Sequence, residues 1–197
     1  MNMNSIDQLK NNARNNHVPI MQDGGIKFIK EYIKDNNIKT ILELGTAVGY
    51  SAINFASIDK DIFVLTVERD QDRYNEAIKN IKDFNLDKQI RVELKDALEF
   101  ETDLKFDLIF IDAAKSQYIK FFERYKHNLN DGGVIITDNL SFHGMVDDLS
   151  LTHNRNTKQL VGKIRKYIEF LKENDEFETT FYQIGDGVSV SRKKKLD

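Results

Sequence analysis

Short apolar runs alternate along the chain with stretches in which apolar residues recur every three or four positions. The short runs predict buried parallel strands at residues 40–44, 62–67, 90–94, 106–111 and 133–137. The stretches with helical spacing predict helices at residues 5–15, 25–36, 50–57, 70–81, 116–129 and 156–173. Two last runs, 178–184 and 188–190, flank a Gly-Asp-Gly turn, which is typical of a β-hairpin.

This alternation predicts an α/β doubly wound sheet, closed by a hairpin that adds at least one antiparallel strand. Asp70 is the expected N-cap of the helix that follows it, and Leu129 is expected to face the core from the end of the helix at 116–129. The pattern shows no repeat and no boundary between domains. We therefore expect a single domain over residues 1–197, with an N-terminal helical segment (1–36), a Rossmann-like core (38–192) and a basic tail (193–197).

Composition narrows the setting in which the protein works. The 197 residues include no cysteine, which excludes disulfides, thiolate metal sites and a cysteine nucleophile. No apolar run approaches the roughly 18 residues of a membrane span, and no signal peptide is recognisable. We therefore expect a cytoplasmic protein without a membrane partner. The formal net charge of −3 argues against nucleic-acid binding over the whole surface but is compatible with a local basic face.

Acidic and amide side chains follow two of the predicted strands at the points where the strands end. Asp112 comes directly after one strand, with Lys115 three residues later, and Asp138 and Asn139 follow the next strand. Ligands of open α/β sheets bind beyond the carboxyl ends of the strands, so these side chains are predicted to meet at one site. Taken singly, Asp138 and Asn139 also fit a turn or helix-cap pair, and Lys115 a solvated lysine. Their combination favours a functional site.

The turn after the first strand favours a nucleoside cofactor. Gly45 and Gly49 allow a tight turn and a close approach to a ligand, and Glu68 ends the next strand, where a carboxylate can accept both ribose hydroxyls. The spacing G-x-x-x-G lacks the pyrophosphate cradle of NAD, which argues against an oxidoreductase. S-adenosylmethionine has no pyrophosphate, and acids such as Glu43 and Asp112 suit its cationic sulfonium and amine. A nucleotide-sensing module without chemistry is the other alternative, but binding alone needs no acid cluster.

Four segments carry a resemblance to a known family. Residues 43–51 (Glu-Leu-Gly-Thr-Ala-Val-Gly-Tyr-Ser), 67–69 (Val-Glu-Arg), 96–97 (Asp-Ala) and 110–115 (Phe-Ile-Asp-Ala-Ala-Lys) resemble class I S-adenosylmethionine-dependent O-methyltransferases of the metal-dependent catechol and caffeoyl-coenzyme A type. The resemblance extends over about residues 17–192. It implies a Rossmann-like fold whose seven-stranded, mostly parallel sheet ends in an antiparallel hairpin and carries helices on both faces. It also implies a homodimer.

The resemblance further implies roles for individual residues. S-adenosylmethionine would be bound by Met21, Glu43, Gly45, Ser51 and Asp112 at its methionine end, by Glu68 at the ribose, and by Asp96 and Ala97 at the adenine; a divalent metal would be bound by Asp112, Asp138 and Asn139; and Lys115 and Asp112 would be catalytic. Two carboxylates and an amide oxygen form a hard, incomplete shell that suits Mg²⁺ or another divalent cation. Lys115 would either accept the proton of the attacking hydroxyl or stabilise the oxyanion.

The acceptor is predicted from a narrower resemblance and from charge. Residues 17–21, 111–118, 134–139 and 185–187 resemble the bacterial tRNA 5-hydroxyuridine methyltransferases, which form 5-methoxyuridine at the wobble position of the anticodon. Basic residues predicted to contact the tRNA anticodon loop are Arg155, Lys158, Lys163, Arg165 and Lys166, followed by Arg192 and Lys193 near the end of the chain. These charges also fit a solvated helix face and a solubilising tail. A small-molecule catechol or caffeoyl-coenzyme A acceptor remains the alternative.

Overall fold

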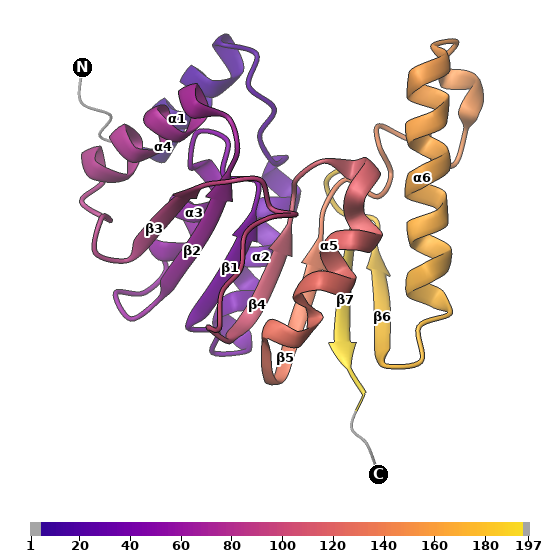
Figure 1. Ribbon diagram of the computed structural model, residues 1–197. Helices are drawn as coiled ribbons and strands as arrows, with labels where there is room; N and C mark the ends of the chain where they lie inside the picture. Colours follow the sequence, from indigo (N-terminus) through magenta and orange to yellow (C-terminus); the bar gives the residue numbers. More distant parts are fainter. Residues whose placement is uncertain (1–4, 195–197) are drawn as a thin grey trace.

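The computed structural model describes residues 5–194 and contains one seven-stranded sheet (Figure 1). The strands are β1 (Thr40–Leu44), β2 (Phe63–Glu68), β3 (Ile90–Leu94), β4 (Phe106–Ile111), β5 (Leu129–Thr137), β6 (Phe177–Tyr182) and β7 (Val188–Lys193). Their order is β3-β2-β1-β4-β5-β7-β6, and β7 runs antiparallel to both of its neighbours while the remaining pairs are parallel. The predicted α/β sheet with a C-terminal antiparallel hairpin is confirmed.

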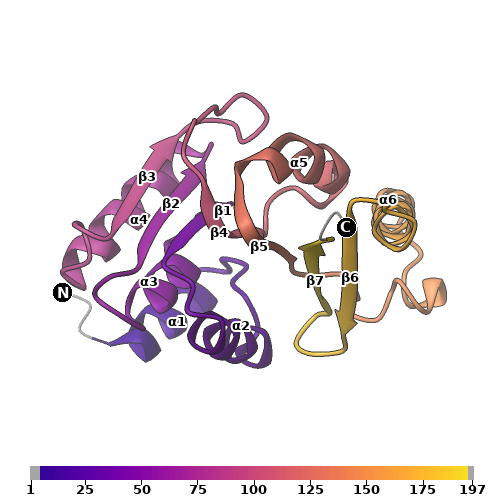
Figure 2. The same cartoon turned by 90° about the horizontal axis from the view of Figure 1, so that it is seen from below.

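Helices cover both faces of the sheet (Figure 2). They are α1 (Ile6–Asn15), α2 (Asp23–Asp35), α3 (Tyr50–Ala56), α4 (Gln71–Asp83), α5 (Tyr118–Tyr125) and α6 (Arg155–Lys172), with short 3-10 turns η1 (Lys115–Gln117), η2 (Lys126–Asn128) and η3 (Leu149–Leu151). Helices α1 to α4 pack on one face, and α5 and α6 pack on the other. No helix in the described part of the chain is long and apolar enough to cross a membrane.

Local chemistry explains where several helices begin. The carboxylate of Asp70 accepts a hydrogen bond of 2.9 Å from the backbone N–H of Arg73, so the predicted N-cap of α4 is confirmed. Asn154 caps α6 in the same way, by accepting from the backbone N–H of Thr157 at 3.0 Å. Helix α3 instead starts after Gly49, whose φ of +83° lies in the left-handed region that glycine adopts without steric cost.

The helix predicted at 116–129 is wrong at its end. Helix α5 stops at Tyr125, and Leu129 is the first residue of β5, where it pairs with Phe106 of β4. The register of this pair shifts before Leu108, and Gly132 has a φ of +76°, so the glycine turn becomes an irregular part of the strand. The spacing of apolar residues past residue 125 is compatible with a helix, but pairing with β4 places Leu129 in the sheet.

An aromatic cluster fixes the second helical layer to the sheet. The ring of Phe122 in α5 makes edge contacts with Phe177 of β6 at 5.0 Å and with Phe170 of α6 at 5.3 Å between ring centroids. Phe122 is fully buried, so replacing it with alanine would cost about 3–5 kcal/mol. This packing joins α5 to both α6 and β6.

Candidate active site

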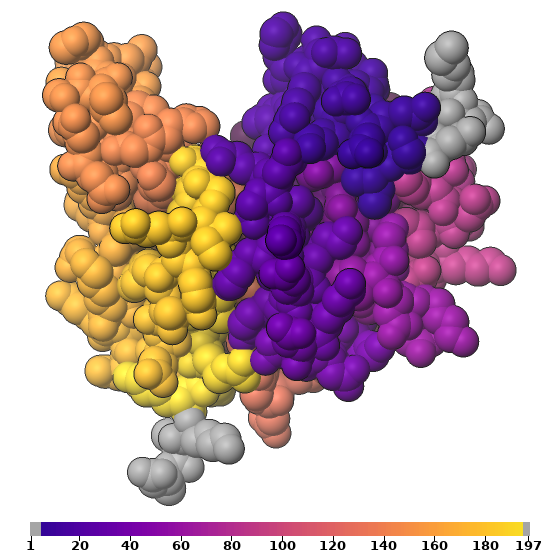
Figure 3. All heavy atoms as spheres, turned by 180° about the vertical axis from the view of Figure 1, so that it is seen from behind, coloured from indigo at the N-terminus to yellow at the C-terminus, as the bar shows by residue number. Residues whose placement is uncertain are grey.

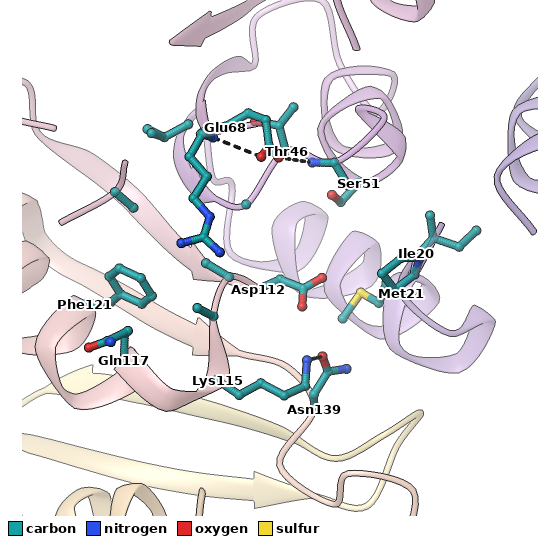
Figure 4. Close-up of a pocket in the computed structure, with 18 of the residues that line it drawn as sticks. Ile20, Met21, Thr46, Ser51, Glu68, Asp112, Lys115, Gln117, Phe121 and Asn139 are labelled. Atoms are coloured by element: carbon teal, nitrogen blue, oxygen red, sulfur yellow. Dashed lines mark hydrogen bonds between the residues drawn. The ribbon is translucent and has the colours of Figure 1, made fainter. Parts of the chain in front are cut away.

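A pocket of about 630 Å³ opens beyond the carboxyl ends of the central strands, where the acids are predicted to meet. Predicted residues that line it are Met21, Gly45, Ser51, Glu68, Asp96, Ala97, Asp112, Lys115 and Asn139. Figure 4 shows Lys115 and Asn139 side by side, with Asp112 between them and Met21. From behind, the same edge of the molecule is hollowed between the N-terminal segment and the region around residue 150 (Figure 3).

Gly45 lies where the turn after β1 meets the end of β4. Its φ is +100°, and its N–H donates to the carbonyl of Val67 at 3.0 Å. A Cβ at this position would lie 2.5 Å from the backbone oxygen of Asp112, closer than any side chain can approach. The glycine therefore allows the turn after β1 to lie directly against the end of β4.

Glu43 does not line the pocket, contrary to the prediction, and lies one layer beneath its floor. It is fully buried, and its two oxygens accept hydrogen bonds from the hydroxyl of Ser51 and, at 2.6 Å, from that of Thr66. Thr66 in turn lies 2.7 Å from the hydroxyl of Thr46. Burial raises the pKa of Glu43 to about 7, although the two hydroxyl donors act in the opposite direction. Glu43 reaches the pocket only indirectly, through Ser51 and through Thr66 and Thr46.

Glu68 and Asp96 organise the opposite wall through backbone hydrogen bonds. Glu68 accepts from the N–H of Ala47 at 2.8 Å and from that of Arg69 at 2.9 Å, so it ties the glycine turn to the end of β2. Asp96 accepts from the N–H of Leu98 at 2.8 Å. Oε1 of Glu68 also accepts from the N–H of Asp70 at 2.9 Å. Oε2 of Glu68 and both oxygens of Asp96 keep a lone pair for a further donor, as a ribose hydroxyl or an adenine amine would require.

Asp112, Asp138 and Asn139 meet at the ends of β4 and β5. Burial raises the pKa of Asp138 to about 8, and the nearby Asp112 adds to the rise because the two carboxylates repel each other. Burial likewise raises the pKa of Asp112 to about 7, against the attraction of Lys115. The ammonium of Lys115 donates to the side-chain oxygen of Asn139 and lies 5.9 Å from the ring centre of Phe142. Asp138 is buried and does not line the pocket, but its carboxylate accepts from the side-chain amide of Asn139, which does. Three oxygen donors and one amine therefore meet at one corner of the site, the acid corner.

The sequence matches the O-methyltransferase family model over residues 2–194. The chain belongs to the O-methyltransferase family. A solved structure of a candidate caffeoyl-CoA O-methyltransferase from Staphylococcus aureus has a TM-score of 0.93 and 41% identity, covering 98% of this chain and 93% of that chain. A catechol O-methyltransferase from Niastella koreensis is 30% identical over 80% of this chain and 72% of its own length.

A third relative identifies the methyl donor of this O-methyltransferase. The O-methyltransferase from Bacillus cereus, solved in complex with S-adenosylhomocysteine, has a TM-score of 0.81 and 26% identity, covering 96% of this chain and 90% of that chain. Together with the family match, it makes this protein an S-adenosylmethionine-dependent O-methyltransferase. S-adenosylmethionine supplies a methyl group on a positively charged sulfur, which an oxygen nucleophile displaces in line.

For this reaction the chain itself would provide acidic groups near the methyl donor and a lysine near the acceptor. Asp112 and the Glu43–Ser51 pair place negative charge and hydrogen-bonding oxygens on the side of the pocket that a cationic sulfonium and amine would occupy. Lys115 faces the acid corner, where an acceptor hydroxyl would lose its proton. The lysine would take that proton as its free amine or stabilise the oxyanion as its ammonium. The ring of Phe142 lies 5.9 Å from the lysine ammonium.

The acid corner fits a divalent cation. The Oδ1 atom of Asp138 is buried and accepts no hydrogen bond from the described residues, while its Oδ2 accepts from the amide of Asn139 at 3.0 Å. Carboxylate and amide oxygens are the donors that Mg²⁺ prefers, and a bound cation would replace the protons that the raised pKa values favour. Within residues 5–194 no three His, Cys, Asp or Glu side chains form such a cluster, since the third donor here is the amide of Asn139. A bound cation would lower the pKa of an acceptor hydroxyl.

Two residues of the site carry little signal in the sequence. The hydroxyl of the buried Tyr118 donates to the backbone oxygen of Asp138 at 3.0 Å, which ties the start of α5 to the end of β5. Asp186, in the hairpin turn, also lines the pocket. Both residues fall in segments that carry the narrower resemblance, 111–118 and 185–187, but the sequence assigns neither a role, because local spacing says nothing about which distant loop a side chain meets.

The predicted basic residues do not form one surface. Arg155, Lys158, Lys163 and Lys166 are exposed on α6, whose first half stands beyond the strand ends (Figure 1). Helix α6 packs against η1, the turn that contains Lys115. Arg165 is used internally, because its guanidinium donates twice to the carbonyl of Val146, at 2.8 and 2.5 Å.

The basic residues at the end of the chain lie far from the pocket. Arg192 pairs with Val134, three residues before the carboxyl end of β5, and donates to the hydroxyl of Tyr32, near the C-terminal end of α2, at 2.7 Å. Lys193 follows it in β7 and pairs with Phe177. Neither residue is brought together with α6 or the pocket, because the antiparallel β7 runs away from that edge. The rest of the predicted basic tail, residues 195–197, lies outside the described residues.

Proposed function

We propose that this O-methyltransferase methylates the 5-hydroxyl of 5-hydroxyuridine at the wobble position of a tRNA anticodon, with Mg²⁺ or another divalent cation held by Asp112, Asp138 and Asn139. The observation that carries the proposal is that the acid corner, with Lys115 in η1, adjoins α6, which packs against η1 and is basic in its first half. The first feature suits an acceptor with two adjacent oxygens, and the second suits a polyanion. 5-Hydroxyuridine in RNA combines both properties.

The chemistry of the base fits the acid corner. In 5-hydroxyuracil the hydroxyl lies next to the C4 carbonyl, which makes an oxygen pair that can chelate a hard cation, as a catechol does. An anticodon loop is single-stranded, so its bases can turn out of the stack at modest cost. Phe142, half-buried on the pocket wall, offers an aromatic face to such a base.

The exposed charges of α6 fit the backbone of the RNA. The side chains of Arg155, Lys158 and Lys163 form no ion pair or hydrogen bond within the part of the chain that the structure describes. They are therefore free to contact phosphates that flank a nucleotide in the pocket, and each such contact makes binding weaker at high salt. Arg192 and Lys193 are not part of this proposal because neither is brought together with α6 or the pocket.

The second candidate is a small-molecule catechol or caffeoyl-coenzyme A acceptor. It is favoured by the similarity to the Niastella koreensis catechol O-methyltransferase and to the Staphylococcus aureus structure. An ortho-diol would present the same pair of oxygens, and coenzyme A is itself anionic. The two candidates therefore differ in their acceptor rather than in their chemistry.

Nucleoside mass spectrometry tests the acceptor directly. tRNA from a strain that lacks this protein should accumulate 5-hydroxyuridine and lose 5-methoxyuridine, and the purified protein should convert one into the other in that tRNA. The parallel assay uses catechol and caffeoyl-coenzyme A. Turnover of either small molecule, with no methylation of the tRNA, would replace the tRNA proposal with the second candidate.

Charge variants test the basic surface. Lys158→Glu should weaken tRNA binding severalfold and reduce its salt dependence by about one phosphate contact. The matched control is Lys172→Glu at the C-terminal end of α6, where the lysine pairs with Glu169 at 2.8 Å. Equal binding by the two variants would exclude the first half of α6 as the contact surface.

Two further proposals have independent tests. Removal of metal with EDTA should abolish methylation, and added Mg²⁺ should restore it; full activity in EDTA would exclude the metal role. The homodimer that the resemblance implies predicts twice the mass of 22.9 kDa in light scattering after gel filtration.

A further inference from the structure

The turn between β6 and β7 lies between two walls of the pocket. On one side Gly185 packs on the first turn of α2, where a Cβ would come within 3.1 Å of the backbone nitrogen of Gly25. On the other side Gly187 packs on Ser141, where a Cβ would come within 2.7 Å of the backbone nitrogen. The turn therefore joins the wall that contains Met21 to the segment that follows Asn139. Figure 3 shows the yellow hairpin against the N-terminal region.

Asp186 at the centre of this turn binds the segment at residues 140–144. Its backbone oxygen accepts from the N–H of Ser141 at 2.7 Å, and its side-chain Oδ1 accepts from the N–H of His143 at 2.5 Å. The residue is only 5% exposed. A buried carboxylate that meets a backbone N–H forms a strong, charge-assisted hydrogen bond.

The segment needs such an external contact because its backbone is unusual. Phe142 has a φ of +47° and His143 a φ of +58°, and Gly144 continues the run at +80°. Non-glycine residues rarely adopt this left-handed region, least of all bulky ones in succession. The hydrogen bond from His143 to Asp186 falls within the run, so it favours this conformation over the extended alternative. The same conformation sets the ring of Phe142 beside Lys115.

We propose that Asp186 is a positioning residue for methyl transfer. Its carboxylate holds residues 142–144 in the left-handed conformation and so places Phe142 on the acceptor side of the pocket, over Lys115. Asp186 acts through the hydrogen bond to His143 and not by touching the methyl donor. The proposal rests on the O-methyltransferase activity of the family and not on the identity of the acceptor.

A tryptophan reporter tests the position of the segment without any acceptor. The chain contains no tryptophan, so Phe142→Trp introduces a single fluorophore at the residue in question. In this background Asp186→Ala should shift the emission to longer wavelength and raise quenching by acrylamide about twofold, because the segment loses its anchor. Asp186→Asn keeps an oxygen that accepts from His143 and should match the parent. Unchanged quenching in Asp186→Ala would overturn the proposal.

The control lies further along the same loop. Asp148 accepts hydrogen bonds from the backbone and hydroxyl of Ser150, and it does not line the pocket. Asp148→Asn should leave the fluorescence of the reporter unchanged. Gly187→Ala disturbs the junction from the other side, by pressing a Cβ on Ser141, and should reproduce the effect of Asp186→Ala.

Kinetics then test the consequence for the reaction. With the acceptor that the wild type methylates, catechol or hydroxyuridine-containing tRNA, Asp186→Ala should raise the acceptor KM about tenfold or more. Its Kd for S-adenosylhomocysteine in calorimetry should stay within about twofold, which also shows that the variant is folded. Asp186→Asn should recover most of the loss. If the asparagine variant were as defective as the alanine variant, the charge of Asp186 and not its hydrogen bond would be what matters, and the proposal would fail.

Discussion

Strand β4 carries one aspartate near its start and one just past its end, and the two carboxylates differ in their hydrogen-bond donors and in their pKa. Asp107 accepts hydrogen bonds from the backbone N–H groups of Lys39 and Thr40, both at 2.9 Å, and from the amide of Asn130 at 2.8 Å. The carboxylate of Asp112 accepts none from the described residues. Partial burial raises the pKa of Asp107, but these donors outweigh it and leave the pKa below its ordinary value of 3.8, whereas the pKa of Asp112 rises to about 7.

The difference shows how one fold separates stability from function. At the amino edge of the sheet a carboxylate meets donors that satisfy it, so its charge stabilises the folded chain. At the carboxyl edge a carboxylate is held near Asp138 and Glu43 without enough donors, so its charge is costly until a cationic ligand arrives. Perturbed titration in a pocket is a mark of a functional site. Four predictions test this contrast.

Asp112→Asn should produce the largest effect. We expect kcat/KM for methyl transfer to fall roughly 100-fold or more, because the variant loses a charge that faces both the donor and the acceptor. The midpoint of thermal unfolding at pH 8 should stay the same or rise, because a repelled buried charge is removed. Methyl transfer assays and circular dichroism melts measure both quantities. Near-normal activity would remove Asp112 from the mechanism.

Gly45→Ala should reduce both the stability of the fold and the binding of the cofactor, because the added Cβ would lie 2.5 Å from the backbone oxygen of Asp112. We expect a loss of roughly 2–4 kcal/mol in the free energy of unfolding, together with weaker binding of S-adenosylhomocysteine. Gly132→Ala is the matched control. Gly132 has a similarly positive φ of +76° but no atom within 4 Å of the added Cβ, so only backbone strain of about 1 kcal/mol should appear. Equal losses in urea denaturation would contradict the clash.

Glu43→Gln should change how stability depends on pH. The folded-state pKa of Glu43 is raised from its ordinary 4.5 to about 7, so its favourable protonated form is fully present below pH 4.5 and is lost as the pH rises through 7. The wild type should therefore lose up to about 3 kcal/mol over this window relative to the glutamine variant. Urea denaturation at several pH values measures the difference. A constant difference across the window would show that Glu43 is ionised in the folded state throughout.

Asp107→Asn should have the smallest effect and the opposite sign. Because the folded-state pKa of Asp107 is lowered, its contribution is present above pH 3.8 and is lost as the pH falls through the folded-state value. At pH 7 the variant should lose about 1 kcal/mol of unfolding free energy, and this loss should shrink in acid. Methyl transfer should be unchanged, which pairs this variant with Asp112→Asn. A loss of activity with intact folding would break the contrast between the two ends of β4.

Local patterns predicted most of the fold and the order of the site residues. Apolar runs marked five strands, because a buried parallel strand needs apolar residues on both faces, and alternation around the Gly-Asp-Gly turn marked the two strands of the C-terminal hairpin. Acids at strand ends predicted the acid corner, because parallel strands deliver their carboxyl ends to one edge. The glycine turn and Glu68 predicted a nucleoside pocket through their spacing alone. These features depend on residues that are neighbours in the sequence, so local patterns are enough to predict them.

Only the tertiary structure decided which side chains meet across the sheet. It put Leu129 into β5, Glu43 beneath the floor of the pocket, and Arg165 on the carbonyl of Val146. It also brought Asp186 against His143, more than forty positions earlier in the chain. Each of these contacts joins segments that approach only when helices and loops pack on the completed sheet. Periodicity describes one element at a time, and so the acids of the site were evident in the sequence while the groups that hold them were not.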